Sequence, residues 1–201
     1  MKKLLLSSIF TYGIISCFSC YAYKNTFTSP DLDFFNLHGQ VKELTLYYTG
    51  CEESGERSPF AGLFAPGSYK FNEAGEWTNP QVYRVERNDN GQIVKFITNE
   101  EPEDRINSES FTWEGKHLKE FSKYANEAIF FYTGDDITKA QINHYYTQFE
   151  MEDIITLSDF KYDNQGNWIS CKWDETITYE DNVVPPLHYS GEINRYIIYR
   201  K

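Results

Sequence analysis

The sequence has 201 residues, of which 24% are charged and 40% hydrophobic, with only 12 Gly and 7 Pro. These proportions are those of one globular domain and exclude a disordered or collagen-like chain. Acidic residues (30) outweigh basic ones (19), which gives a formal net charge of −11. We expect no nucleic-acid partner, because such a charge repels a polyanion and the densest basic stretch beyond the N-terminus is only Lys116–Lys123.

The N-terminus has the pattern of a secretory signal peptide. Lys2 and Lys3 form a positive region, and the apolar stretch from residue 4 to 15 is too short to span a bilayer. Cys20-Tyr21-Ala22 places small residues where a signal peptidase cutting after Ala22 requires them. We therefore predict a signal peptide over residues 1–22, an N-terminal extension over 23–36 and a single β domain over 37–201.

A second form of processing competes with simple cleavage. Ile14-Ile15-Ser16-Cys17 resembles a bacterial lipobox, in which Cys17 would be lipidated and would become the first mature residue. We favour simple cleavage because residues 18–23 stay apolar, whereas a lipoprotein usually continues into a polar tether. A lipid anchor at Cys17 would be the only contact with a membrane. Loss of Lys2 and Lys3 changes the net charge from −11 to −13.

Two cysteines, Cys51 and Cys171, remain in the mature chain. Outside the cytoplasm such a pair favours a disulfide, which would close a loop of roughly 120 residues and stabilise the fold by about 4 kcal/mol. The alternative is that Cys171 is a buried strand residue and Cys51 an exposed loop thiol. Neither thiol has the histidine context of a catalytic cysteine, and two Cys with four scattered His give no metal-ligand spacing.

From Leu37 onward, short β-type runs alternate with turns that contain Gly, Asn or Asp. Residues 168–179 show the clearest period of two, with Ile169, Cys171 and Trp173 alternating with polar residues. A helix competes with a strand only over 139–152, where we favour a strand. The predicted strands cover 40–48, 81–88, 92–98, 111–113, 118–124, 128–132, 137–149, 154–162, 168–179 and 193–200.

Four segments share one turn scheme. In its fullest form an aromatic residue ends a strand, Asn or Asp begins a tight turn, and Gly takes the left-handed position. Asn90-Gly91 is the strongest hairpin signal, because both residue types tolerate the positive φ of a type I′ turn. The glycines are unevenly spaced, which indicates a family of hairpins rather than a strict solenoid. The segments are 71–77, 88–93, 113–118 and 162–168, with a looser fifth copy at 132–137.

Two segments interrupt this pattern. Thr49–Gly67 is a run of 19 turn-forming residues around an apolar centre at residues 60–64. Loops of this length are uncommon in compact domains and are often functional. The second segment, Glu180–Gly191, contains Pro185-Pro186, and we expect an extended excursion between the last two strands.

The segments Phe71–Trp77 and Tyr162–Trp168 resemble the tyrosine-aspartate (YD, or Rhs-type) repeat. The chain as a whole resembles the small exported proteins of Bacteroidetes that are built from divergent copies of this repeat, with further likeness at Leu37–Lys42 and Arg195–Tyr199. The resemblance implies an antiparallel sheet of successive hairpins. It implies no functional residue, because such proteins are largely uncharacterised. With the signal peptide, it places the protein in the periplasm, at the outer membrane or outside a Gram-negative cell.

The sequence contains no recognisable catalytic motif. The carboxylate pairs at residues 52–53, 100–101 and 135–136 are adjacent on the chain and would point to opposite faces of a strand, whereas a glycosidase needs two carboxyls facing across a cleft. Asp89 and Asp163 lie in turns without the array of oxygens that calcium requires. A Gly-x-Ser-x-Gly elbow and a phosphate-binding loop are also absent. We therefore expect a protein without enzymatic activity, metal or cofactor.

Aromatic residues are the best binding candidates, with 15 Phe, 16 Tyr and 4 Trp. Trp77, Trp113, Trp168 and Trp173 would suit a platform on which sugar rings stack. The structural alternative, which we favour, is that they pair across strands and fill the core.

These observations predict an all-β fold, an antiparallel meander of about ten hairpin-linked strands from degenerate YD-like repeats. The meander would form either a curled sheet or a two-layer sandwich. The function we expect is a non-catalytic binding or cell-envelope module with a glycan or an envelope protein as ligand. The alternative is an extracellular polysaccharide-acting enzyme with a site near loop 49–67.

Overall fold

The computed structural model describes residues 27–49, 64–80, 82–97, 108–124, 126–146, 149–180 and 184–201. These residues form one short helix, α1 (Pro30–Phe34), and eleven strands. The strands are β1 (Val41–Thr49), β2 (Gly67–Lys70), β3 (Arg84–Arg87), β4 (Ile93–Ile97), β5 (Ser108–Glu114), β6 (His117–Lys123), β7 (Asn126–Thr133), β8 (Asp136–Tyr146), β9 (Phe149–Tyr162), β10 (Trp168–Tyr179) and β11 (Leu187–Tyr199).

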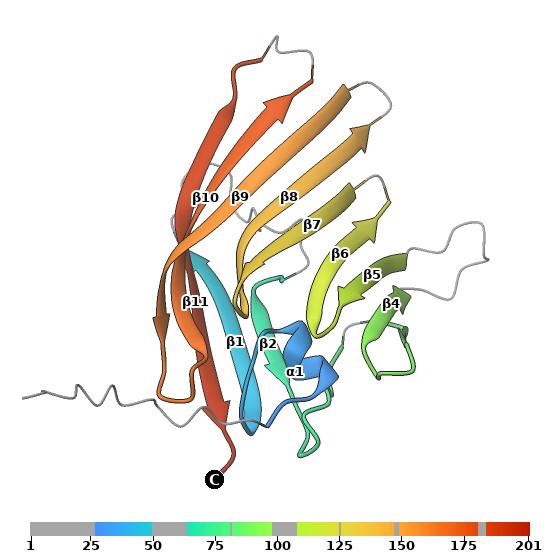
Figure 1. Cartoon of the computed structure of the whole chain (residues 1–201), viewed down its shortest axis with the longest axis vertical. Helices are drawn as coiled ribbons and strands as arrows, with labels where there is room; N and C mark the ends of the chain where they lie inside the picture. Colours follow the sequence, from blue (N-terminus) through green and yellow to red (C-terminus); the bar gives the residue numbers. More distant parts are fainter. Residues whose placement is uncertain are drawn as a thin grey trace, which may run out of the picture.

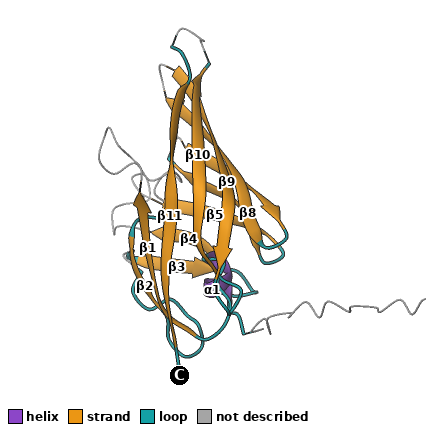
Figure 2. Ribbon diagram, turned by 90° about the vertical axis from the view of Figure 1, so that its left-hand side faces the viewer, coloured by secondary structure: helices purple, strands orange, loops and turns teal. Residues whose placement is uncertain are grey.

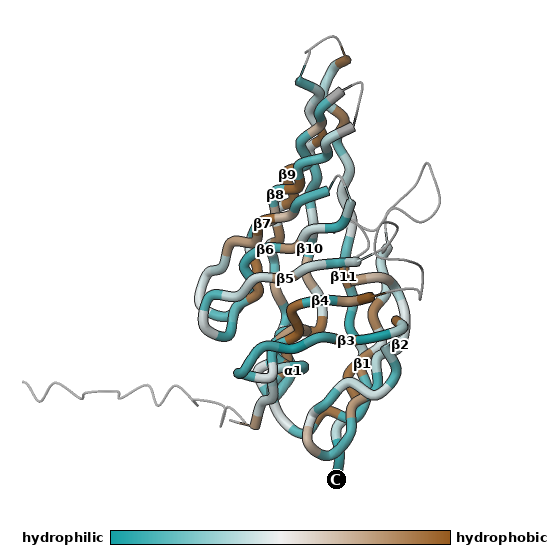
Figure 3. Tube along the Cα trace, turned by 90° about the vertical axis from the view of Figure 1, so that its right-hand side faces the viewer, coloured by the Kyte–Doolittle hydropathy of each residue, from teal (hydrophilic) through white to brown (hydrophobic). Residues whose placement is uncertain are grey.

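All eleven strands belong to one antiparallel sheet, in the order β2-β1-β11-β10-β9-β8-β7-β6-β5-β4-β3. Strands β3 to β11 follow one another as neighbours, and β1 pairs with β11, the last strand (Figure 1). The predicted all-β antiparallel meander is therefore confirmed. Of the two predicted architectures, the curled single sheet is the one observed. Figures 2 and 3 show β3, β4 and β5 running across the direction of the long strands β10 and β11.

Helix α1 lies inside the curl of the sheet, at its lower end (Figure 1). Local sequence explains its start: Ser29 is the N-cap and accepts a hydrogen bond from the backbone N–H of Leu32 at 3.1 Å, and Pro30 occupies the first turn. Leu32 and Phe34 are buried, as is Phe35 just after the helix. The segment expected only as an N-terminal extension thus contributes a helix to the core.

Three of the predicted turns share the same hydrogen bonds. Each turn begins with an Asn or Asp residue whose side-chain Oδ1 accepts hydrogen bonds from the backbone N–H groups two and four residues later in the chain. These first residues are Asn72, Asn88 and Asp163. The backbone carbonyl of the same residue accepts from the glycine N–H three positions on. The expected left-handed glycines are confirmed: φ lies between 62° and 84° at Gly75, Gly91, Gly115, Gly134 and Gly166.

Two stretches differ from the predicted strands. Gly67–Lys70 pairs with β1 as strand β2, although it follows directly on the long loop and carries little β-type sequence. Leu187–Gly191 continues β11 and pairs with β10, so much of the expected excursion after Pro185-Pro186 is strand. Both stretches are strands because a neighbouring strand pairs with them, and their own sequences do not favour a strand. The predicted strand over 139–152 is confirmed as parts of β8 and β9.

The core lies on the concave face of the sheet and around α1, and it is rich in aromatic rings. Phe34 contacts Phe96 and Phe111 edge to face, with ring centroids 6.0 and 5.3 Å apart. Phe35 contacts Phe71 and Trp77 in the same way, at 5.6 and 5.3 Å. The helix therefore joins aromatic residues from both ends of the sheet.

Candidate functional site

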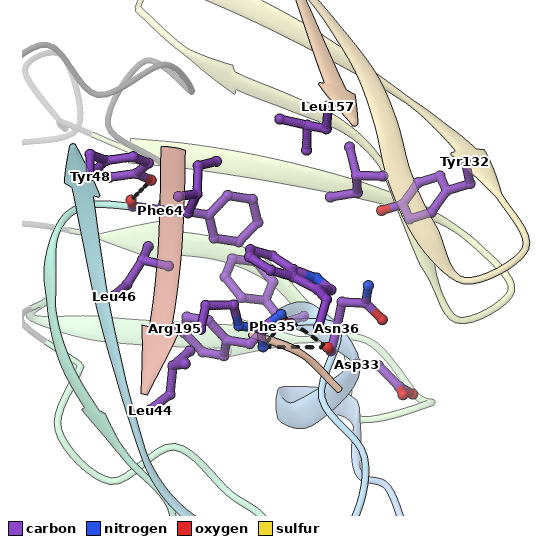
Figure 4. Close-up of a pocket in the computed structure, with 14 residues that line it drawn as sticks. Asp33, Phe35, Asn36, Leu44, Leu46, Tyr48, Phe64, Tyr132, Leu157 and Arg195 are labelled. Carbon is purple, nitrogen blue, oxygen red and sulfur yellow. Dashed lines mark hydrogen bonds between the residues drawn. The ribbon is translucent and has the colours of Figure 1, made fainter. Parts of the chain in front are cut away.

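A small cavity lies between the end of α1 and the concave face of the sheet (Figure 4). Its volume is about 40 Å³. Apolar side chains supply most of its wall, and Asp33 and Asn36 line it on the α1 side. The lining residues are Asp33, Phe34, Phe35, Asn36, Leu44, Leu46, Tyr48, Phe64, Tyr132, Ile137, Leu157, Trp168, Ile193 and Arg195.

Arg195 is the cation of this cavity and is 5% exposed. It reaches from β11 to the end of α1, where its guanidinium donates to the carbonyl oxygens of Phe35 at 3.0 Å and Asn36 at 3.4 Å (Figure 4). The guanidinium carbon lies 4.0 Å from the ring centroid of Trp168, a cation–π contact. Burial lowers the pKa of Arg195 to about 10, because desolvation disfavours the charged form.

Two tyrosines close other parts of the cavity wall. The hydroxyl of Tyr48 donates to the carbonyl of Phe64 at 2.5 Å, and that of Tyr132 donates to the carbonyl of Leu118 at 2.9 Å. Burial raises the pKa of Tyr132 well above its ordinary value. Both hydroxyls are thus used within the protein, and these tyrosines present mainly their rings to the cavity.

The four tryptophans proposed for a sugar platform pack into or against the core. Trp173 is 1% exposed, and Trp77, Trp113 and Trp168 are half-buried beside core residues. The indole N–H of Trp113 donates to the carbonyl of Ile93 at 2.7 Å. This placement fits the structural role that the sequence favours. Whether any of the four also contacts a ligand stays a prediction.

Cys171 is a free thiol, buried within β10, and burial raises its pKa to about 12. Its predicted partner Cys51 lies outside the described residues, as do Cys17 and the whole signal peptide. The disulfide and the lipidation alternative both stay predictions. Most of the loop 49–67 proposed for an enzymatic site also lies outside the described residues.

The convex face carries a pair of exposed tyrosines that the sequence analysis missed. Tyr47 of β1 and Tyr196 of β11 are 47% and 64% exposed. The register pairs Tyr47 with Asn194 and Thr45 with Tyr196, so the two tyrosines are diagonal neighbours on one face. Such neighbours lie about 7–8 Å apart, Cα to Cα. The alternation of residues in β1 could have predicted the exposure of Tyr47. Leu44 and Leu46 are buried on one face of the strand, so Tyr47 points to the other face.

Polar and small side chains surround this tyrosine pair. Asn194 lies between the strands of Tyr47 and Ser170, since it pairs with both residues, and Thr45 pairs with Ser68 of β2. Directly opposed residues of antiparallel strands point to the same face, so hydroxyl and amide groups flank the two rings. We call Tyr47, Tyr196, Thr45, Asn194, Ser170 and Ser68 the tyrosine face.

A buried polar row crosses the upper part of the concave face. The ring nitrogens of His144 lie 2.9 Å from Asn126 Oδ1 and 2.9 Å from Asp153 Oδ2. Asp153 of β9 and Glu175 of β10 are each 3% exposed. The register opposes Asp153 to Ile177 and Glu175 to Ile155, which makes the two carboxyl groups diagonal neighbours on this face.

In the described part of the chain, no three His, Cys, Asp or Glu side chains are grouped so that they could hold a metal ion. The same part contains no helix long and apolar enough to cross a membrane. The chain matches no protein-family model, and no curated protein is similar to it in sequence.

Proposed function

We propose that the chain is an exported, non-catalytic binding module of the bacterial cell envelope and that its ligand is a glycan. The observation that carries the proposal is the tyrosine face. Two exposed phenol rings on adjacent strands match the apolar faces of successive sugar rings, and the amide and hydroxyl groups between them match sugar hydroxyls. A partner protein is the other ligand class and is an outcome of the test below.

The proposed place among small exported YD-like repeat proteins has its own support. Three turns, at residues 72–76, 88–92 and 163–167, repeat one set of hydrogen bonds, although the third begins 75 residues after the second. A repeated turn with so little sequence identity is what divergent copies of one hairpin unit would leave. Export to the periplasm or the cell surface follows from the signal-peptide pattern of residues 1–22.

The test is native electrophoresis of the mature chain in gels cast with different polysaccharides. The double variant Tyr47→Ala/Tyr196→Ala removes both rings, and Tyr83→Ala/Tyr124→Ala removes two other exposed tyrosines as a matched control. We expect a polysaccharide that retards the natural chain to bind the first variant about tenfold more weakly and the control unchanged. If no polysaccharide retards the natural chain, the glycan proposal is wrong and a protein ligand takes its place.

The alternative, a polysaccharide-acting enzyme, is favoured by the pair Asp153 and Glu175. Asp153 and Glu175 lie on neighbouring strands and point to the same concave face, as two carboxyls of one site must, although both are 3% exposed and Asp153 lies 2.9 Å from His144. Release of reducing sugar from a polysaccharide panel tests it. Activity that disappears in both Asp153→Asn and Glu175→Gln would replace the binding proposal with the enzymatic one.

A further inference from the structure

An open groove lies where β1 begins and β11 ends, at the lower end of the sheet in Figure 1. Its volume is about 700 Å³. Ligand sites in proteins commonly measure about 300–1,000 Å³, so the groove has room for a sugar residue. We call it the basic groove, and its lining residues are Gln40, Lys42, Glu73, Ile198, Tyr199, Arg200 and Lys201.

The basic groove is positively charged, although the chain as a whole is acidic. Lys42, Arg200 and Lys201 line it together with one carboxylate, that of Glu73. A carboxyl group at the end of the chain would still leave the groove positive. None of the ion pairs among the described residues includes any of the three cations. Charges farther away than about 8 Å are largely screened at physiological ionic strength, so a ligand in the groove responds mainly to these local charges.

The backbone holds two of these cations on opposite strands of the groove. The backbone N–H of Arg200 donates to the carbonyl of Gln40 at 2.8 Å, and its guanidinium donates to the carbonyl of Phe71. The N–H of Phe71 donates in turn to the carbonyl of Lys42 at 3.0 Å. One chain of hydrogen bonds therefore fixes the positions of Lys42 and Arg200 relative to each other.

The basic groove continues the tyrosine face along β11. Side chains of a strand alternate between its faces, so Tyr196, Ile198 and Arg200 follow one another on the same face. The rise of a strand places Tyr196 and Arg200 about 14 Å apart along it. Glu43 lies opposite Ile198, but Lys70 is in turn opposite Glu43, so this carboxylate does not cancel the charge of the groove.

We infer that the glycan bound at the tyrosine face carries a carboxylate, on a sugar residue that lies in the basic groove. This inference rests on the glycan proposal above and names the class of glycan. Lysine and arginine donors form charge-assisted hydrogen bonds with carboxylate oxygens, while the two tyrosine rings contact the neutral part of the chain. The glycan carries carboxylates at intervals rather than on every residue, because the acidic surface beyond the groove repels a dense polyanion.

Calorimetric titration of the mature chain tests the inference, with fragments of glucuronoxylan and of xanthan as probes. Both polysaccharides carry glucuronic acid on a minority of their sugar residues. The matched controls are the same fragments after chemical reduction of the carboxyl groups to alcohols, which keeps every glycosidic linkage and removes the charge. We expect the acidic fragments to bind at least about tenfold more tightly than the reduced ones at low ionic strength.

The outcomes of this titration separate the inference from the glycan proposal. Equal binding of acidic and reduced fragments would overturn the carboxylate requirement and leave the glycan proposal standing. If neither form of either fragment binds, the inference is also overturned, and the electrophoresis with other polysaccharides decides the glycan proposal on its own.

Two double variants locate the charge that matters. Lys42→Gln/Lys201→Gln removes two exposed cations of the basic groove, and Lys116→Gln/Lys119→Gln removes the same charge from the β5–β6 hairpin. Affinity for the acidic fragments should fall about tenfold in the first variant and less than about twofold in the second. Equal losses in the two would show that only the net charge matters and would overturn the inference.

The tyrosine variant tests whether one ligand spans both surfaces. Tyr47→Ala/Tyr196→Ala should also weaken binding of the acidic fragments about tenfold, although it leaves every charge of the basic groove in place. Unchanged affinity of this variant for the acidic fragments would mean that the groove binds them without the tyrosine face, which would overturn the inference.

Discussion

The carboxylate of Asp31 in α1 accepts hydrogen bonds from both terminal nitrogens of Arg87, at 2.5 and 2.9 Å. Arg87 ends β3, one edge strand of the sheet, whereas the backbone N–H of Trp77, which donates to the same carboxylate at 2.7 Å, belongs to the turn that follows β2, the other edge strand. Asp31 is 1% exposed. One buried carboxylate thus ties the two ends of the open sheet to the helix between them.

Asp31→Asn should therefore destabilise the whole fold. The substitution keeps the shape but removes the charge that both partners contact, and it leaves the Arg87 guanidinium without its ion pair. Loss of a partner in a fully buried pair costs about 3–5 kcal/mol. Because Arg87 is 35% exposed, we expect about 2 kcal/mol. Urea unfolding followed by tryptophan fluorescence measures it, and Asp89→Asn in the exposed turn should change stability by less than about 0.5 kcal/mol. Equal stability of the two variants would contradict the role of Asp31.

A comparison of Gly75→Ala with Gly134→Ala separates two costs to stability: the strain of a positive φ, which both variants share, and the steric clash of the added Cβ, which only Gly75→Ala has. Both glycines have positive φ, 78° and 64°, so alanine costs about 1 kcal/mol at either position. An added Cβ at Gly75 would lie 2.7 Å from Ser29 Oγ, whereas at Gly134 it meets nothing within 4 Å. Moving Ser29 would also weaken the N-cap of α1, worth about 1 kcal/mol. Thermal unfolding should show Gly75→Ala to be clearly the less stable variant, and the reverse order would be inconsistent with this contact.

Local chemistry in the sequence was enough to predict the turns and most of the strands. The Asx and Gly positions of turns such as 88–92 set their own geometry, because a side-chain oxygen and a left-handed glycine act within five residues. Alternation likewise predicted the buried face of β10. Strand β2 and helix α1 were not predicted, because their stability comes from partners distant in the chain, namely β1 for the strand and Asp31 with its contacts for the helix.

The candidate sites were less accessible to sequence reasoning. Arg195 occupies an alternate position of β11 between Ile193 and Ile197, whose side chains face the core. An arginine at a position where the alternation predicts an apolar residue was the one sign of this site in the sequence. The diagonal contact position of Tyr47 and Tyr196 depends on β1 pairing with β11, the pair of strands most distant in the chain. No local pattern specifies that register. The sequence therefore indicated the tryptophans, each of which is recognisable on its own, and gave no sign of two tyrosines that only the fold places side by side.

The thiol of Cys171 should be unreactive in the folded protein. Burial raises its pKa to about 12, so at pH 8 the nucleophilic thiolate is scarce and covered. We expect no labelling by iodoacetamide until the chain is unfolded in the presence of a reductant. Because the folded pKa lies above that of the unfolded chain, this residue's contribution to stability is present below about pH 9 and is lost as the pH rises toward 12.

Labelling also tests the predicted disulfide between Cys51 and Cys171. If the bond forms in the exported protein, urea alone will not expose Cys171 to iodoacetamide, and a reductant will. Complete labelling in urea without reductant would show that the disulfide prediction is wrong. Fast labelling of the native protein would instead contradict the burial of Cys171.

Asn167→Asp and Asn164→Asp make the same chemical change at two positions of one turn. Asn167 is 1% exposed; its Nδ2 donates to the carbonyl of His38 at 2.8 Å and to the Tyr199 hydroxyl at 2.6 Å. An aspartate there removes both donors and buries a carboxylate close to Asp163. We expect a loss of about 2–3 kcal/mol at pH 7, since each unsatisfied buried group costs about 1–3 kcal/mol. Asn164 is exposed, and its variant should lose less than about 0.5 kcal/mol.

The pH dependence of Asn167→Asp gives a sharper check. Burial and the nearby Asp163 should raise the pKa of the new carboxyl above its unfolded value of about 3.9. Its protonated form can donate a hydrogen bond again, so stability relative to the natural chain is greatest below that unfolded value and is lost as the pH rises through the folded pKa. Urea unfolding at pH 4 and pH 7 should show the gap between the two variants widening with pH. A gap that stays constant would mean that Asn167 contributes by its shape alone.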